Sequence, residues 1–278
     1  LGYLDEQAMQ AVDPDAAVIF VINHRSNMDY VLVTYMAASS SALSYAVGEW
    51  ARVWLLQNLI RSMGAYFVRR DSREPLYRKV LARYVHLAIA GGLTQAMFPE
   101  GGLTRDGTLR PPKLGLLSYM VSGFDPHGPR DAVFVPVGLN YDRVLEDRIQ
   151  VGALPTSEGE KPRFRFSPAV LIGFIANRIK LRWQGRLYRY GYACVSFGRP
   201  ISLRRYCVEH GLDLRLLNEK RRFAEVERLG QMLMRKVGEV VPALPVPLVA
   251  AVILGAAKPL SALELKSEVE ILIRRLIA

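Results

Sequence analysis

Four apolar runs in the first half of the chain each end in a polar segment. The run 17–22 is continuously apolar and rich in β-branched residues, and the polar cluster 23–27 follows it. Continuous apolar runs of this length are typical of strands buried on both faces, and the polar residues after them mark the loop into which the strand leads. The same pattern predicts strands at 64–68, 94–98 and 132–139, and a later run predicts another at 194–197.

Segments with helical spacing of apolar residues alternate with these runs. A helix is predicted over 30–38, with Ser26 or Asn27 as a suitable N-cap. Pro75 suits the first position of a later helix, where a missing N–H is tolerated. Further helices are predicted over 43–63, 76–90, 216–240 and 262–277, and the amphipathic segment 43–63 suits either the core or a membrane-facing surface.

Alternation of strands and helices predicts a three-layer α/β domain. In such a domain the loops that follow the carboxyl ends of the strands carry the functional residues. Pro136 lies inside the run 132–139 and cannot donate to a sheet ladder, so it favours a position near a sheet edge or a bulge.

The segment 240–257 is the one stretch that approaches a membrane span. It has no charged residue over 18 positions, but three prolines crowd its first half. The helix that can follow from Leu248 is about half of the ~20 residues needed to cross a bilayer. We therefore expect a buried or interfacial helix here.

The composition is that of a folded, basic chain. Of the 278 residues 50% are hydrophobic and 23% charged, which excludes disordered and collagen-like proteins. Lysine and arginine exceed the acidic residues by 37 to 26, so the net charge of +11 favours anionic partners.

Cysteine and histidine usage excludes two further classes. Only Cys194 and Cys207 are present, which rules out a disulfide framework and favours a reducing compartment. The four histidines lie far apart, and no spacing brings two metal ligands onto one element. A zinc site is therefore not expected.

His24 and Asp29 form the first candidate for chemistry. If Ser26 or Asn27 caps the helix, Asp29 falls in its first turn and can reach back to one ring nitrogen of His24. That contact would fix the tautomer of the imidazole and make its other nitrogen a base. No Gly-x-Ser-x-Gly elbow supplies a nucleophile, so direct activation of a substrate hydroxyl fits better than a covalent acyl-enzyme. Chance alone could also produce this spacing, since the chain has four histidines.

Two further loops carry candidate binding residues. Arg69 and Arg70 follow the run 64–68; they are either a solvated charge run or a pair of guanidinium groups that bind phosphate. Glu100 is either a turn residue or an acceptor for substrate hydroxyls. Its neighbours Gly101 and Gly102 would let backbone N–H groups approach a substrate, and Arg105 and Lys113 add positive charge nearby.

Together these motifs resemble those of the glycerolipid acyltransferase family. His24-x-x-x-x-Asp29, Gly-Ala-Tyr-Phe-Val-Arg-Arg at 64–70, Phe-Pro-Glu-Gly-Gly at 98–102 and Val-Pro-Val-Gly at 135–138 have the order and rough spacing of its four motifs. The chain is most similar to glycerol-3-phosphate 1-O-acyltransferases of the large bacterial and mitochondrial type. One departure is Leu103, which stands where the third motif often has an arginine, whereas Arg105 matches the next one.

The resemblance implies a fold and a set of roles. The fold would be a mixed, largely parallel central sheet flanked by helices, with additional C-terminal helices. His24 would be the general base, oriented by Asp29, and Arg70, with Arg69 as a second candidate, would hold glycerol phosphate. Glu100, Gly101, Gly102, Arg105 and Lys113 would line the acceptor site, and Pro136, Val137 and Gly138 would contribute the fourth motif and the acyl pocket.

The resemblance also implies the reaction and its setting. An acyl group would move from acyl-CoA or acyl-carrier protein to the sn-1 hydroxyl of glycerol 3-phosphate, giving lysophosphatidate for phospholipid synthesis, without metal or cofactor. The enzyme would bind an anionic membrane surface peripherally, on the cytoplasmic face of a bacterial inner membrane. We expect one catalytic domain over 1–278, with its motifs in 17–142 and a helical part over 210–278, taken from a longer chain.

Two sets of alternatives stay open. Dihydroxyacetone phosphate or lysophosphatidate could replace glycerol 3-phosphate as acceptor, because only the shape of the acceptor pocket separates them. A non-catalytic basic module could instead bind acidic lipid or nucleic acid through the arginine-rich segments 178–189 and 204–222. No nucleic-acid-binding signature is present, so a nucleic-acid partner is not expected.

Overall fold

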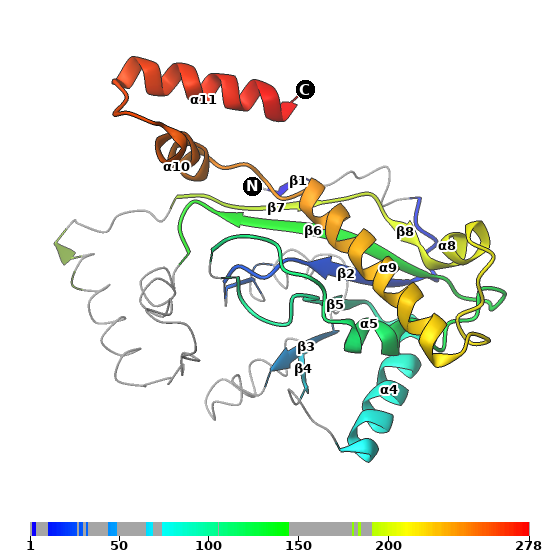
Figure 1. Ribbon diagram of the computed structural model, residues 1–278. Helices are drawn as coiled ribbons and strands as arrows, with labels where there is room; N and C mark the ends of the chain where they lie inside the picture. Colours follow the sequence, from blue (N-terminus) through cyan, green and yellow to red (C-terminus); the bar gives the residue numbers. More distant parts are fainter. Residues whose placement is uncertain are drawn as a thin grey trace. The chain divides into compact units, whose positions relative to one another are not determined.

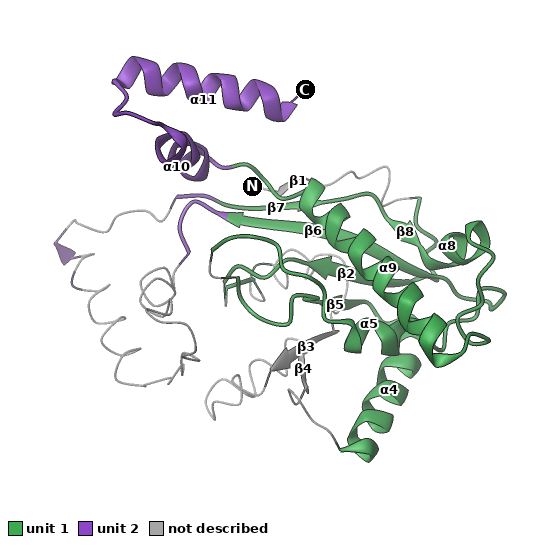
Figure 2. Ribbon diagram, viewed as in Figure 1, with its two compact units in different colours: residues 1–140, 193–243 green, residues 141–192, 244–278 purple. Residues whose placement is uncertain are grey.

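We analysed a computed structural model of the chain (Figure 1). It describes residues 2–3, 11–26, 28–29, 32, 44–48, 65–68, 74–104, 106–144, 180, 183–184 and 191–277. The contacts group the chain into two compact units, Leu1–Asn140 with Ala193–Ala243, and Tyr141–Tyr192 with Leu244–Ala278 (Figure 2). The division of the chain into domains stays a prediction.

The described residues form an eight-stranded, largely parallel sheet. Its strands, in spatial order, are β1 (Gly2–Tyr3), β7 (Ala193–Phe197), β6 (Ala132–Tyr141), β2 (Ala17–Ile22), β5 (Gln95–Met97), β3 (Ser44–Gly48) and β4 (Ala65–Val68). Strand β8 (Ile201–Ser202) pairs with β6 off this path and runs antiparallel to it, whereas β2 pairs in parallel with both β5 and β6. The mixed, largely parallel sheet with flanking and C-terminal helices is confirmed.

The central strands are apolar because the sheet is covered around them. All residues of β6 except the last are buried, and β2 is buried at four of its six positions. Its neighbours on both sides satisfy the backbone of β2, so a continuous apolar run can lie in the middle of the sheet without unpaired polar groups.

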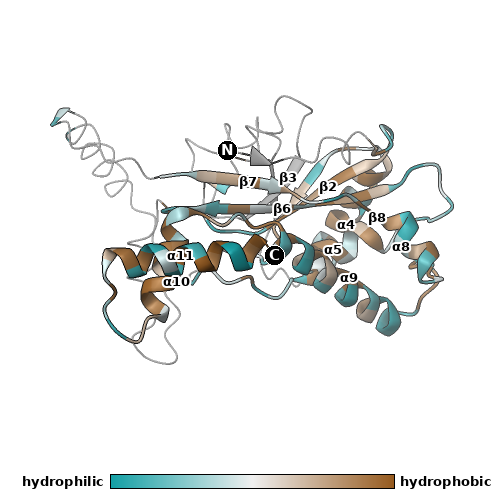
Figure 3. Cartoon of the chain, turned by 90° about the horizontal axis from the view of Figure 1, so that it is seen from above, coloured by the Kyte–Doolittle hydropathy of each residue, from teal (hydrophilic) through white to brown (hydrophobic). Residues whose placement is uncertain are grey.

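Three helices contribute buried apolar side chains to the core of this unit. They are α4 (Pro75–Ala90), α5 (Leu114–Val121) and α9 (Glu219–Glu239). The apolar residues of α9 recur at helical spacing and are buried in that core, and the side chain of Asn218 caps the helix by accepting from Arg221 N–H. Its exposed side carries charged residues, which appear teal in Figure 3. The core residues of α9 are Val226, Leu229, Leu233 and Val237.

Helix α8 (Leu203–Glu209) is fixed to the start of β6 by Asp131. One carboxylate oxygen of Asp131 accepts from the Ser202 hydroxyl at 2.5 Å, and the other accepts from Arg204 N–H at 3.0 Å. The Ser202 hydroxyl also accepts from Arg205 N–H at 2.9 Å, so the helix begins at a capped residue.

The predicted elements are largely confirmed, with one correction. The five predicted strands correspond to β2, β4, β5, β6 and β7, and the predicted helices after Pro75, near 216 and over 262–277 are present. The helical prediction for 43–63 is wrong at Ser44–Gly48, which forms β3, because pairing with β4 and β5 outweighs local helical spacing. The rest of that segment, and most of 30–38, lie outside the described residues.

Pro136 lies in an interior strand and not at a sheet edge. On one side β6 pairs with β2; on the other its neighbour changes from β7 to β8 close to Pro136. The Pro136 carbonyl still accepts from Gly198 N–H at 2.7 Å. The missing N–H therefore falls where the neighbour of β6 changes. The expected edge position is wrong, and the pairing of β6 with β2 runs without a bulge from Ala132 to Val137.

The second unit contains α10 (Pro245–Gly255) and α11 (Ala262–Ile277), which pack on each other. No residue of α10 is buried, so the expectation of a buried helix in this segment is wrong. The interfacial role stays a prediction. No described helix has the length and apolar character to span a membrane.

We expect that Gly138, the glycine of β6, cannot be replaced by a residue with a side chain without loss of stability. A Cβ at this position would lie 2.3 Å from the carbonyl oxygen of Val240, which is backbone and cannot move aside easily. We expect Gly138→Ala to reduce the free energy of unfolding by about 1–3 kcal/mol, measured by urea denaturation. The control Gly115→Ala lies in α5 with open space around its Cβ, and should stabilise by up to about 1 kcal/mol. Equal effects at the two positions would contradict this account.

Candidate active site

Two of the predicted motifs, those of His24 and Glu100, meet at one edge of the sheet. Strands β2, β5 and β6 run in parallel, so their carboxyl ends lie together. The first two lead into the loops that carry His24 and Glu100. At Asn23, directly after β2, the chain leaves the sheet. The side-chain amide of Asn23 donates to the Leu139 carbonyl at 3.0 Å, and its side-chain oxygen accepts from Leu139 N–H at 2.7 Å. This side chain replaces a ladder pair and frees the backbone to turn away at His24.

His24 and Asp29 make the contact that the sequence predicts. The Nδ1 of His24 lies 2.9 Å from Asp29 Oδ2, and both side chains are buried. The same oxygen accepts from the N–H groups of Arg25 at 2.7 Å and Ser26 at 3.0 Å. An oxygen that accepts from two backbone donors is unprotonated, so Nδ1 donates to it and Nε2 carries the lone pair.

Glu100 connects this histidine loop to the loop after β5. Its Oε1 accepts from His24 N–H at 2.9 Å and its Oε2 from Arg110 N–H at 3.2 Å. Glu100 is 2% exposed, and this burial raises the pKa of its carboxyl group, although the two backbone donors oppose the shift. Contact between Glu100 and a substrate hydroxyl stays a prediction; the structure adds a link between two loops.

The His24 ring is also held on its sides. The ring of Phe98 lies 4.5 Å from it, centroid to centroid, and Thr104 N–H donates to the His24 carbonyl at 2.9 Å. Hydrogen bonds within the loop after Thr104 stabilise its turn. Asp106 Oδ1 accepts from the hydroxyl of Thr108 at 2.7 Å and from its N–H at 3.0 Å. These bonds hold the pKa of Asp106 at about 2, below its ordinary 3.8.

Two positively charged side chains flank these loops. Gly107 has a φ of +79°, and a Cβ there would lie 2.9 Å from the guanidinium of Arg25, so this side chain passes over the 104–108 loop. Burial lowers the pKa of Arg25, while the carboxylates of Glu100, Asp29 and Asp106 oppose that shift. Lys113 is exposed, and its methylene groups lie over Gly101, whose φ is +65°.

Two family models match the chain over most of its length. The acyltransferase model covers residues 5–140, and the model of the C-terminal region of glycerol-3-phosphate acyltransferases covers residues 179–278. The chain belongs to the acyltransferase family. The His24–Asp29 pair, Glu100 and the fourth motif all lie within the first match.

Relatives with curated names agree with this assignment. A glycerol-3-phosphate acyltransferase of Pseudomonas fluorescens (strain SBW25) is 30% identical over 266 residues, which are 91% of this chain and 30% of that protein. The enzyme of that name from Pseudomonas putida (strain KT2440) is 31% identical over 267 residues with the same coverage. That from Aeromonas hydrophila is 31% identical over 208 residues, 74% of this chain and 24% of that protein. The chain therefore spans less than a third of the length of these relatives.

Some residues predicted for this acyltransferase site lie outside the described residues, namely Arg69, Arg70 and Arg105. The strand before the arginine pair is described. Strand β4 runs parallel to β3, and β3 to β5, so the carboxyl end of β4 faces the same edge as His24. Three strand spacings separate β4 from β2, or about 14 Å. The phosphate-binding role of these arginines stays a prediction.

The fourth motif of the acyltransferase lies in the sheet and not in a loop. Pro136 pairs with Val21 and Val137 with Ile22, and Gly138 lies beneath the backbone of Val240. Its role in an acyl pocket stays a prediction. Among the described residues no group of three histidine, cysteine or acidic side chains could hold a metal ion.

Sequence reasoning missed Asn23 and Thr104. The only local signal for Asn23 was a buried-strand pattern that ends in a polar residue. Its partner, Leu139, is 116 residues away, and nothing in the local pattern indicates this pairing.

Glu100→Gln should loosen the link between the two loops. A carboxamide offers one acceptor oxygen where the carboxylate offers two, so the N–H of either His24 or Arg110 loses its partner, at a cost of about 1–3 kcal/mol in the free energy of unfolding. Urea denaturation near neutral pH would measure this difference. Glu227→Gln, at an exposed position of α9, is the matched control and should leave stability within about 0.5 kcal/mol of the parent. An unchanged midpoint for Glu100→Gln would show that the link is not required for stability.

Proposed function

We propose that this acyltransferase moves a fatty acyl group from a thioester to the sn-1 hydroxyl of glycerol 3-phosphate, with His24 as general base. The observation that carries the proposal is Asp29 Oδ2, which accepts from His24 Nδ1 and from two backbone N–H groups. This arrangement fixes the ring so that the basic nitrogen is Nε2. The name of the relatives supports glycerol 3-phosphate as acceptor.

The reaction transfers one acyl group and one proton. Nε2 of His24 takes the hydroxyl proton while the alcohol oxygen attacks the thioester carbonyl carbon, and a tetrahedral oxyanion forms. When the carbon–sulfur bond breaks, the imidazolium returns the proton to the leaving thiolate. Asp29 stabilises the imidazolium in between, as the carboxylate does in a serine protease triad.

The proposed substrates are a phosphorylated acceptor and a thioester donor, acyl-CoA or acyl-carrier protein. The phosphate of glycerol 3-phosphate would bind Arg70, with Arg69 beside it, after β4 at the edge that His24 occupies. Neither step changes an oxidation state, and the proton is held by protein groups, so the proposed reaction names no cofactor. The product would be lysophosphatidate, an intermediate for phospholipid synthesis.

We further propose that the chain works at an anionic membrane surface as a peripheral protein on the cytoplasmic face. The net charge of +11 supports attraction to acidic lipid headgroups. Helix α10 supports it as well, because Leu254 is 85% exposed and the helix contains no charged residue.

His24→Ala should remove the activity. Loss of a general base lowers kcat by about 10²- to 10⁴-fold. The fold should remain, because Asp29 Oδ2 keeps its two backbone N–H donors when the ring is removed. The measurement is formation of lysophosphatidate from labelled palmitoyl-CoA and glycerol 3-phosphate, with circular dichroism as the test of folding. His127→Ala, at an exposed loop position, is the matched control and should keep full activity. Undiminished turnover by folded His24→Ala would refute the proposed base.

Arg70→Ala should separate acceptor binding from donor binding. Loss of a charged hydrogen bond to phosphate should raise the KM for glycerol 3-phosphate about 10- to 100-fold and leave the KM for acyl-CoA unchanged. Arg83→Ala, on the exposed side of α4, is the control for loss of a positive charge.

The same assay with three acceptors decides between the related activities. Glycerol 3-phosphate, dihydroxyacetone phosphate and lysophosphatidate are compared by kcat/KM. Preference for either of the last two would overturn the proposed acceptor, and no turnover with any of them would favour the non-catalytic basic module.

A further inference from the structure

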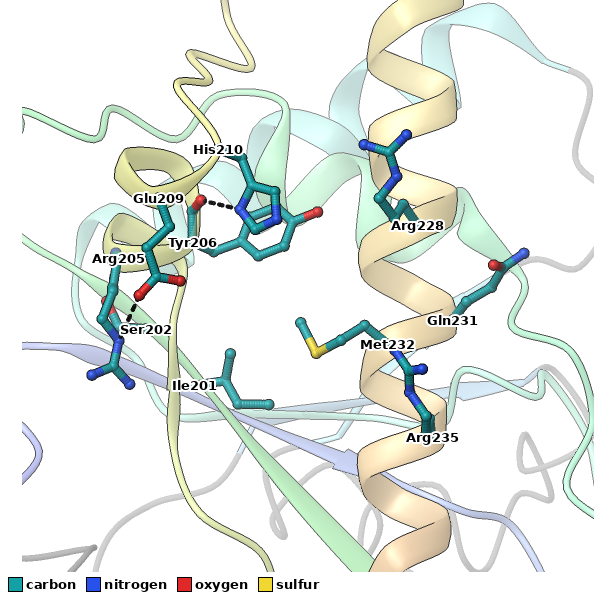
Figure 4. A pocket seen from close by; sticks show the side chains of 10 residues that line it. All are labelled: Ile201, Ser202, Arg205, Tyr206, Glu209, His210, Arg228, Gln231, Met232 and Arg235. Atoms are coloured by element: carbon teal, nitrogen blue, oxygen red, sulfur yellow. Dashed lines mark hydrogen bonds and ion pairs between the residues drawn. The ribbon is translucent and has the colours of Figure 1, made fainter.

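A pocket lies in the first unit between β8, α8 and α9. Its volume is about 590 Å³, and arginines, a tyrosine and a histidine line it (Figure 4). Strand β8 pairs with Val133 and Phe134, at the amino end of β6. The His24 loop leaves the sheet at Asn23, beside Leu139, which lies five to six residues further along β6, or about 17–20 Å away. The pocket is therefore separate from the candidate active site.

Positive charge exceeds negative charge around this pocket. Arg205 pairs with Glu209 at 3.8 Å, an exposed contact that contributes little. Arg228 donates to both oxygens of Glu225 at 3.0 Å. Arg235 also lines the pocket, and in the described part of the chain no carboxylate lies within ion-pair distance of it. The guanidinium of Arg235 can therefore bind an anion in the pocket.

The hydroxyl of Tyr206 is the second observation. Tyr206 is 8% exposed, and among the described residues its hydroxyl oxygen has no hydrogen-bond partner. Figure 4 shows this hydroxyl pointing toward α9. Burial, together with the charge of Glu225, raises the pKa of Tyr206, although Arg228 opposes this shift, so the hydroxyl keeps its proton and can donate. A buried polar group is usually paired, and a ligand in the pocket would pair this one.

His210 completes the polar side of the pocket. Its ring stacks on that of Tyr206 at a centroid distance of 4.3 Å. Its Nδ1 lies 2.8 Å from the Tyr206 carbonyl, which can only accept, so Nδ1 donates to it. Ile201 and Met232 add apolar side chains to the lining.

We propose that this pocket binds a phosphate monoester. Arg235 and the Tyr206 hydroxyl offer donors to the phosphate oxygens, and Arg228 adds positive charge. Guanidinium groups match the spacing of phosphate oxygens, and the side chains of Ile201 and Met232 suit the carbon part of the ester. Both a free phosphate compound and the monoester headgroup of an acidic lipid have this chemistry. The proposal does not depend on the catalytic role of His24.

Isothermal titration with inorganic phosphate tests the site on the full chain. Because the proposed acceptor site would also take phosphate, the titration is made in an Arg70→Ala background. We expect saturable binding there, and Arg235→Ala or Tyr206→Phe should weaken it about tenfold, the effect of one hydrogen bond to a charged group. Arg221→Ala is the matched control: it removes an exposed arginine from the same helix about 21 Å away, and should bind as the Arg70→Ala parent does.

Tyr206→Phe also gives a readout that is independent of affinity. Without ligand this variant loses a buried, unpaired hydroxyl, so its melting temperature should be equal to or above that of the parent. A folded Tyr206→Phe or Arg235→Ala protein that binds phosphate like the parent would overturn the proposal, as would a parent without saturable binding to either phosphate source.

Vesicles distinguish the two sources. Phosphatidylcholine vesicles that contain phosphatidate present a phosphate monoester, and those that contain phosphatidylglycerol present a diester. Arg235-dependent binding to phosphatidate vesicles assigns a lipid headgroup, and binding of inorganic phosphate alone assigns a soluble ligand. Equal, Arg235-independent binding to both vesicles, without binding of free phosphate, would show a general electrostatic surface and refute the site.

Discussion

The arrangement of the candidate active site depends on one carboxylate oxygen. Asp29 Oδ2 accepts from the ring of His24 and from two backbone N–H groups of the same loop. The three donors fix the path of the loop and the tautomer of the ring together. A side chain that only touched the ring would orient it, but would not hold the backbone from which it projects.

The sheet supplies the frame for this arrangement. Parallel strands bring loops that are about 76 residues apart in sequence to the same edge, and Glu100 then joins them through His24 N–H. Burial makes this carboxyl group sensitive to its partners, because an unpaired buried charge is far more costly than an exposed one. Asn23 likewise joins the end of β2 to β6, because its side-chain amide replaces a pair of backbone hydrogen bonds to Leu139. Rigidity at the site therefore comes from polar groups that are buried and paired.

The C-terminal part of the first unit contributes at both ends of the sheet. After α9 the chain crosses Gly138, so the backbone of Val240 covers the fourth motif. At the other end α8 and α9 enclose the phosphate pocket that we propose. Helix α9 thus lines a separate pocket and leads into the segment that covers the fourth motif, so both lie within the same compact unit.

The sequence by itself determined five of the eight described strands, the helices α4, α9 and α11 and the His24–Asp29 contact, because these depend on apolar periodicity and on residues five positions apart. Tertiary structure decided what local patterns do not encode. Segment 44–48 became a strand because two distant strands pair with it, and Pro136 lies in the sheet interior because the neighbour of β6 changes there. The partners of Glu100 and the unpaired hydroxyl of Tyr206 likewise follow from which distant elements pack together. Hydrogen bonds between segments far apart depend on the register and packing of the whole sheet, and no local pattern specifies them.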